Sequence, residues 1–178
     1  IVSAPLGGEN YLLRTVTGPS GYAVLWLNYR QGTRRLALYE SRTGETRLLP
    51  PTGFRSFPQV EAVLADGWVR EVYFLGEQDR SVDLFHLELG SQALTRLTRS
   101  PQCLRGFGLT ETPAAATIEY QTRSEVGRLT YATQNRQVRA SERRARPQAV
   151  VPPPTPATNH PASYYNTYIG FGDSITWG

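Results

Sequence analysis

The residues best suited to chemistry lie at the end of the chain, where Asn166 to Gly178 reads N-T-Y-I-G-F-G-D-S-I-T-W-G. Asn166 to Phe171 is typical of a short strand, and Gly172-Asp173-Ser174 predicts a turn at its carboxyl end. A serine nucleophile must be exposed at such a strand end so that substrate reaches its Oγ. Gly172 permits a tight turn, and the amide of Ser174 can donate to a developing oxyanion. This segment predicts nucleophilic chemistry at Ser174, although Gly-Asp-Ser also occurs as an ordinary turn.

The run F-G-D-S-I-T-x-G, residues 171–178, resembles the first conserved block of the SGNH hydrolases, also called GDSL esterases and lipases. The resemblance implies that Ser174 is the nucleophile and one oxyanion donor, and that Gly172, Asp173 and Thr176 support the turn. It also implies a serine ester hydrolase that acts through an acyl-enzyme on an acylated carbohydrate or lipid. The family's other oxyanion donors, a Gly and an Asn, and its Asp and His would follow Gly178. We therefore expect these 178 residues alone to be inactive.

The two histidines do not supply the missing base. His86 falls in an expected strand, on the face opposite to Phe85 and Leu87, and we interpret it as a surface or half-buried residue; His160 lies ahead of Ser174 in a proline-rich stretch. A single cysteine, Cys103, excludes an internal disulfide framework and a cysteine zinc site, and we expect a buried thiol. The sequence has no Asp-rich calcium loop and no Gly-rich phosphate loop, so no metal or cofactor is expected.

The elements ahead of this segment are short strands in repeated meanders. Strands are expected at 22–29, 36–40 and 46–49, then at 60–64, 70–75, 82–89 and 94–98, and more weakly at 117–122, 128–133 and 137–141. Turns with glycine, such as Asp66-Gly67, separate them. The tripeptide Thr-Arg-Leu occurs at 46–48 and again at 95–97, 49 residues apart, in the expected last strand of each repeat.

Repeats of about 40–50 residues with about four strands each are typical of propeller blades. The pair Val82-Asp83-Leu84-Phe85 and Leu94-Thr95-Arg96-Leu97-Thr98 resembles TolB-like blades, in which a D-L-Y-like strand accompanies a terminal R-L-T strand. The fold class expected is mainly β, an incomplete antiparallel β-propeller. An unrelated antiparallel meander or sandwich is the alternative. Three blades cannot close a ring, and a chain that begins at Ile1 without any Met is expected to be a fragment cut at both ends.

The composition changes at Arg146, after which six prolines follow within 15 residues. Such a stretch favours a semi-rigid polyproline linker; a docking peptide for a proline-binding module is the alternative. The domains expected are therefore blades at 1–142, a linker at 143–163 and the start of the hydrolase domain at 164–178. We expect the parent protein to be exported to the periplasm or the exterior, because of the linker, the TolB-like type of the blades and the tendency of the SGNH family toward export.

Charge and hydropathy narrow the range of partners. The net charge is +4, and all 19 basic residues are arginine. The dense run Arg136, Arg139, Arg143, Arg144 and Arg146 is interpreted as a solvated domain edge rather than a nucleic-acid site, because no recognition helix or aromatic groove accompanies it. No apolar run is long enough to span a membrane. The competing function is a binding module for a glycan, peptide or envelope partner. Trp26, Trp68 and Tyr73 are candidates for contacting such a partner, but they fall in expected strands and we expect them in the core.

Overall fold

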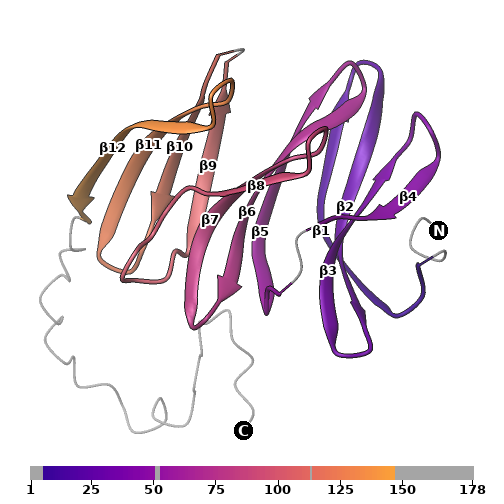
Figure 1. The fold of residues 1–178 in the computed structure, drawn as a ribbon, viewed down its shortest axis with the longest axis horizontal. Helices are drawn as coiled ribbons and strands as arrows, with labels where there is room; N and C mark the ends of the chain where they lie inside the picture. The colour runs from indigo at the N-terminus through magenta and orange to yellow at the C-terminus, as the bar shows by residue number, and fades with distance from the viewer. Residues whose placement is uncertain (1–5, 51–52, 113, 147–178) are drawn as a thin grey trace, which may run out of the picture. The chain divides into compact units, whose positions relative to one another are not determined.

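The computed structural model describes residues 6–50, 53–112 and 114–146, and this part of the chain consists of strands without an α-helix. Figure 1 shows these strands as three separate twisted sheets. The strands are β1 (Glu9–Gly18), β2 (Gly21–Arg30), β3 (Thr33–Glu40), β4 (Glu45–Leu48), β5 (Ser56–Ala65), β6 (Trp68–Gln78), β7 (Ser81–Glu88), β8 (Ala93–Arg96), β9 (Gly106–Glu111), β10 (Ala116–Gln121), β11 (Glu125–Ala132) and β12 (Gln137–Ala145).

Each sheet is a four-stranded antiparallel meander in which neighbours in sequence are neighbours in space, in the orders β1-β2-β3-β4, β5-β6-β7-β8 and β9-β10-β11-β12. We call these sheets blades 1, 2 and 3. The first strands contact one another, β1 against β5 and β5 against β9, so they form the inner edge of an arc. The fold is an open, partial β-propeller, as the repeats predicted.

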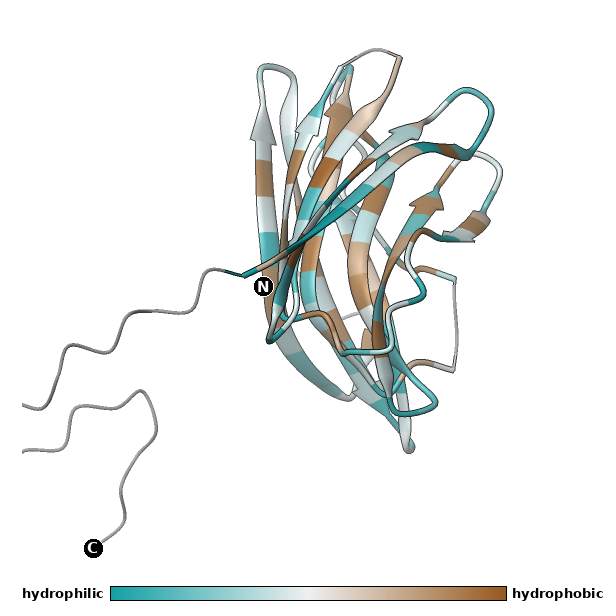
Figure 2. Ribbon diagram, turned by 90° about the vertical axis from the view of Figure 1, so that its left-hand side faces the viewer, coloured by the Kyte–Doolittle hydropathy of each residue, from teal (hydrophilic) through white to brown (hydrophobic). Residues whose placement is uncertain are grey.

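Two apolar clusters hold the arc together, one in each space between blades. Apolar and polar residues alternate along the strands, as Figure 2 shows by colour. Strands β5, β6 and β7 of blade 2 supply residues to both clusters, because their successive side chains point to opposite faces. Phe54, Phe74 and Phe85 lie in the cluster between blades 1 and 2, and Tyr73, Leu75 and Leu84 lie in the cluster between blades 2 and 3. Blade 2 therefore has both faces covered, and it joins the other two blades.

Tight turns with left-handed backbone connect several of the strands. Gln31-Gly32 and Asp66-Gly67 both have positive φ at two successive residues, 50° and 79° in the first and 54° and 82° in the second. These values are those of type I′ turns, whose twist matches antiparallel strands. The turns predicted from Gly32 and Gly67 are therefore confirmed.

The inner strand was missed in blades 1 and 3, since β1 and β9 both fall entirely outside the predicted strands. In β1 a bulge between Leu12 and Arg14 shifts the register against β2, which interrupts the period of two that identifies a strand. In β9, Gly106 and Gly108 replace the side chains that would have shown the alternation. At the other end, β12 continues to Ala145, three residues beyond the expected end of the blades at 142.

The paired motif in blade 2 is a buried hydrogen-bond network around Asp83. The fully buried carboxylate of Asp83 accepts hydrogen bonds from the Thr98 hydroxyl at 2.9 Å and the Ser100 amide at 3.0 Å, and it forms an ion pair with Arg96. The Thr98 hydroxyl in turn accepts from the Leu84 amide at 3.0 Å. The D-L-F strand and the R-L-T strand therefore occur together because their polar side chains satisfy one another.

The two Thr-Arg-Leu tripeptides are not structurally equivalent. The amide of Leu49 donates to the carbonyl of Leu36, and the amide of Leu97 donates to the carbonyl of Leu84, each at 2.8 Å. These matching bonds relate the blades by 48 residues, whereas the tripeptides are 49 apart. Leu97 in the second tripeptide is therefore matched by Leu49 and not by Leu48.

Candidate functional site

The predicted nucleophile segment lies outside the described residues. This applies to Gly172, Asp173, Ser174 and Thr176, and to His160 in the proline-rich stretch. Their roles stay predictions from sequence. The described part of the chain offers a different candidate, which is a hollow at the carboxyl ends of the inner strands β1, β5 and β9.

The hollow lies where the three inner strands end. The carboxyl ends of β1, β5 and β9 converge there around a volume of about 460 Å³. Each of the first two strands stops at a turn, at Pro19-Ser20 and at Asp66-Gly67. The hollow has apolar and polar lining residues. The apolar ones are Val16, Ala62, Val63, Leu64 and Leu109, the polar ones are Thr17, Ser20, Asp66 and Glu111, and the remaining ones are Gly18, Pro19 and Gly67. An apolar wall with a few polar groups is the usual composition of a ligand site.

Glu111 is the group of this hollow whose charge is most sensitive to its surroundings. Burial, followed by repulsion from the nearby carboxylate of Glu71, raises the pKa of Glu111 to about 7. The Tyr73 hydroxyl lies 3.4 Å from Glu111 Oε1 and donates to Glu71 Oε2 at 2.8 Å. Glu111 therefore takes up a proton near neutral pH and can both donate and accept a hydrogen bond in the hollow.

Glu71 behaves in the opposite way because it has stronger partners. Burial acts to raise the pKa of Glu71, but hydrogen bonds from His86 and Tyr73 outweigh it, and the pKa lies below its ordinary value. The pKa of the Tyr73 hydroxyl is raised by burial and by its bond to Glu71. Two carboxyls that share one tyrosine therefore differ in charge state at neutral pH.

His86 is buried, and this corrects the prediction that it is a surface or half-buried residue. It is 1% exposed, its Nε2 lies 3.1 Å from Glu71 Oε2, and its ring packs between those of Tyr73 and Tyr131. The predicted side of the strand is right, because His86 points away from Phe85 and Leu87 and toward blade 3. The space between blades 2 and 3 is filled there by rings, so substrate cannot reach the imidazole and His86 is structural.

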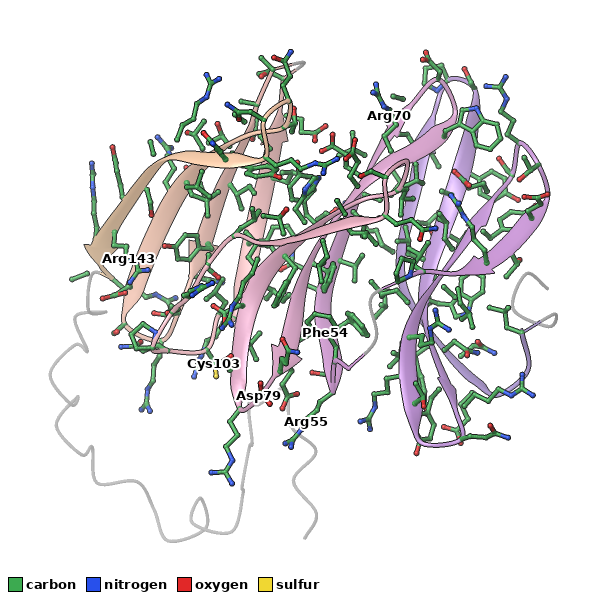
Figure 3. All side chains as sticks on the ribbon, viewed as in Figure 1. Phe54, Arg55, Arg70, Asp79, Cys103 and Arg143 are labelled. Atoms are coloured by element: carbon green, nitrogen blue, oxygen red, sulfur yellow. The ribbon has the colours of Figure 1, made fainter. Side chains whose placement is uncertain are left out.

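Other residues singled out from the sequence separate into core and surface. Trp26 and Tyr73 are buried, as expected. Trp68 was also expected in the core, but it is 38% exposed, and the Arg42 guanidinium lies 5.3 Å from its ring centre. Cys103 is exposed, contrary to the expected buried thiol, with Sγ 3.6 Å from the Arg80 carbonyl oxygen. In Figure 3 it lies at one end of blade 2 near Asp79. Cys103 lies in the connection between β8 and β9, outside the strands that form the core.

The arginine run is a strand edge with one contact to blade 2. All residues of β12 are exposed, and Figure 3 marks Arg143 on this strand. Arg136, at the turn before it, binds the carboxylate of Glu88 and the hydroxyl of Ser91. The prediction of a solvated edge agrees with this arrangement. Arg136 adds an exposed ion pair between blades 2 and 3.

Sequence reasoning missed Glu71 and Glu111. Glu71 had a usable signal, because Glu71, Tyr73 and Leu75 occupy one face of a strand at period two and a carboxylate on an apolar face needs a partner. Glu111 had none, since β9 was not predicted. Within residues 6–50, 53–112 and 114–146, no group of three or more His, Cys, Asp or Glu side chains can hold a metal ion. The same residues include no helix of the length and apolarity needed to cross a membrane.

No protein-family profile and no curated protein sequence matches this chain. Solved structures do match in fold. The β-propeller domain of the trilobed protease from Pyrococcus furiosus, described as having an open velcro topology, aligns with a TM-score of 0.56 at 11% identity, over 77% of this chain and 44% of that chain.

Acylaminoacyl peptidase in complex with Z-Gly-Gly-Phe-chloromethyl ketone aligns with a TM-score of 0.50 at 8% identity, over 77% of this chain and 25% of that one. Pyrococcus horikoshii acylaminoacyl peptidase aligns at 0.49 and 8% identity, over 78% and 25%. The chain thus spans less than half the length of these structures, and at such identity they show its fold alone, a partial β-propeller.

Proposed function

We propose that this chain belongs to a serine ester hydrolase of the SGNH type, in which the blades are an accessory module and Ser174 is the nucleophile. The observation that carries the proposal is the run F-G-D-S-I-T-x-G at 171–178, which comes directly after a proline-rich stretch. The likeness of the blades to the β-propeller domain of a protease supports a hydrolase parent, because that propeller is a domain of a hydrolytic enzyme. The SGNH type itself rests on the motif.

The mechanism that follows is acyl transfer in two steps. The Ser174 hydroxyl gives its proton to a base and attacks the ester carbonyl, and the backbone amide of Ser174 stabilises the oxyanion of the tetrahedral intermediate. Collapse of this intermediate breaks the ester C–O bond and releases the alcohol, and water then hydrolyses the acyl-enzyme to release the acid and restore Ser174. A base must take the serine proton, and His86 is closed off between two tyrosine rings. The base is therefore expected outside the blades.

The test is substitution of Ser174 in the full-length protein that carries these residues. Ser174→Ala is expected to lower hydrolysis of p-nitrophenyl butyrate by up to about 10⁶-fold and to abolish labelling by a fluorophosphonate. The matched control is Ser163→Ala, which lies outside the motif and is expected to change neither. Retention of full esterase activity by Ser174→Ala would overturn the proposal.

A binding role for the blades is a second candidate, and the hollow at the ends of β1, β5 and β9 favours it. Its apolar wall and the carboxyl of Glu111 suit an apolar group that carries a hydrogen-bond donor, as in a peptide or a glycan. We expect Leu109→Asp to abolish binding on a peptide and glycan array, with Thr117→Asp on blade 3 as the matched control. Equal binding by both variants would exclude the hollow as the site.

A further inference from the structure

Blade 1 carries apolar side chains on the face that points away from blade 2. We call this face, made of Leu12, Val24, Trp26, Ala37 and Tyr39, the outer face of blade 1. The side chains lie in two rows across the sheet, because Leu12 pairs with Trp26 and Trp26 with Ala37, while Val24 pairs with Tyr39. The next row is polar. Asn28 and the Trp26 indole both donate to Asn10 Oδ1 at 2.8 Å, and Arg35, which pairs with Asn28, donates to the Leu49 carbonyl oxygen at 3.3 Å.

Residues whose numbers differ by 48 occupy equivalent positions in blades 1 and 2, so blade 2 shows what the equivalent face contacts there. The residues of blade 2 that are equivalent to the outer face of blade 1 are Val60, Val72, Phe74, Phe85 and Leu87. All five belong to the apolar cluster between blades 1 and 2. In blade 2, therefore, the matching face is the one that packs against the preceding blade.

The outer face of blade 1 has the composition of an interface but is covered only in part. Trp26 and Ala37, on the two central strands, are buried, whereas the positions around them are not. Leu12 is 70% exposed, whereas its counterpart Val60 is 3% exposed. Val24 and Tyr39 are half-buried, and their counterparts Val72 and Leu87 are completely buried. Apolar surface of this kind is unfavourable in water and marks a contact region.

The other end of the arc is built differently. The face of blade 3 that points away from blade 2 carries Thr117, Glu119, Arg128 and Thr130, with an ion pair between Glu119 and Arg128. Packing an apolar sheet on this face would remove charges from water at a large cost. Blade 3 therefore has the polar outer surface of a terminal repeat.

We propose that a further four-stranded blade packs on the outer face of blade 1. It would present an apolar surface like the one that Leu25, Leu36 and Leu38 offer to blade 2. A second copy of these blades does not fit in the same head-to-tail arrangement. The corresponding faces of its blades 1 and 2 are already covered, and that of its blade 3 is charged.

The test supplies a blade and measures whether the outer face accepts it. A second copy of residues 6–53 is joined directly before Leu6 of the full chain, so that the 48-residue spacing of blades 1 and 2 is kept. The added blade is expected to raise the melting temperature by about 5 °C or more relative to the unextended chain.

Leu12→Glu in the original blade 1 is expected to remove this increase, whereas the matched control Thr117→Glu on blade 3 leaves it in place. Two results would overturn the proposal: an extended chain with unchanged melting temperature, or equal behaviour of the two variants. Sedimentation of the unextended chain gives a third criterion, because a stable dimer that Leu12→Glu dissociates would assign the face to a second copy instead.

Discussion

Replacing Asp83 by Asn removes one charge from blade 2 with almost no change in volume. The Asp83 carboxylate is fully buried and accepts from Thr98 and the Ser100 amide, and it pairs with Arg96. An asparagine keeps one acceptor oxygen but turns an amide group toward donors, and it leaves the Arg96 guanidinium without its countercharge. Breaking a buried pair in this way costs about 3–5 kcal/mol.

The Arg96 side chain is 37% exposed, so water compensates part of this loss. We therefore expect Asp83→Asn to lower the free energy of unfolding by about 2–4 kcal/mol and the melting temperature by about 5–15 °C. Urea and thermal unfolding followed by circular dichroism in the β-sheet band measure both quantities.

The matched control is Glu119→Gln, which removes an ion pair with Arg128 on the exposed face of blade 3. Exposed pairs contribute about 0–1 kcal/mol, so this variant is expected to unfold close to the wild type. If Asp83→Asn also unfolded within about 1 kcal/mol of the wild type, the network would not be the reason that the D-L-F and R-L-T strands occur together.

Two further substitutions test the site and the core. Because the pKa of Glu111 rises to about 7 on folding from an ordinary value of 4.5, the folded protein holds this proton more tightly, so its stability falls as pH rises between these values; Glu111→Gln should flatten that part of a urea-midpoint profile, and an unchanged slope would contradict the assignment. A Cβ at Gly76 would lie 2.5 Å from the Phe54 ring, whereas one at Gly90 would meet nothing within 4 Å. Gly76→Ala should therefore cost about 1–3 kcal/mol and Gly90→Ala less than about 0.5 kcal/mol, and similar denaturation midpoints for the two variants would argue against this packing of Phe54.

The strands of blade 2 could be predicted from sequence because side-chain alternation there is regular on both faces. Phe85, Leu87 and the opposed Leu84 and His86 follow the period of two closely. The bulge in β1 and the glycines in β9 removed the same signal from the inner edge. The hollow consequently could not be predicted, since its lining comes from the ends of three inner strands that are far apart in sequence.

His86 and Cys103 were misplaced for a related physical reason. A strand of blade 2 has two buried faces, so a polar residue opposite to a core residue is not thereby exposed. Only a neighbouring sheet reveals this, and the sequence of one strand does not contain it. Cys103, conversely, is an apolar residue type in the connection between β8 and β9, and it is exposed there.

The order of strands in the three sheets has a consequence for how the arc folds and comes apart. Every sheet is made of one continuous stretch of chain, and no strand crosses into another sheet. Such an architecture behaves as a row of units coupled to nearest neighbours, and its contacts are short in sequence, which favours rapid folding. Blade 2, coupled on both sides, should then be the slowest to exchange its amide hydrogens, with protection decreasing toward blades 1 and 3.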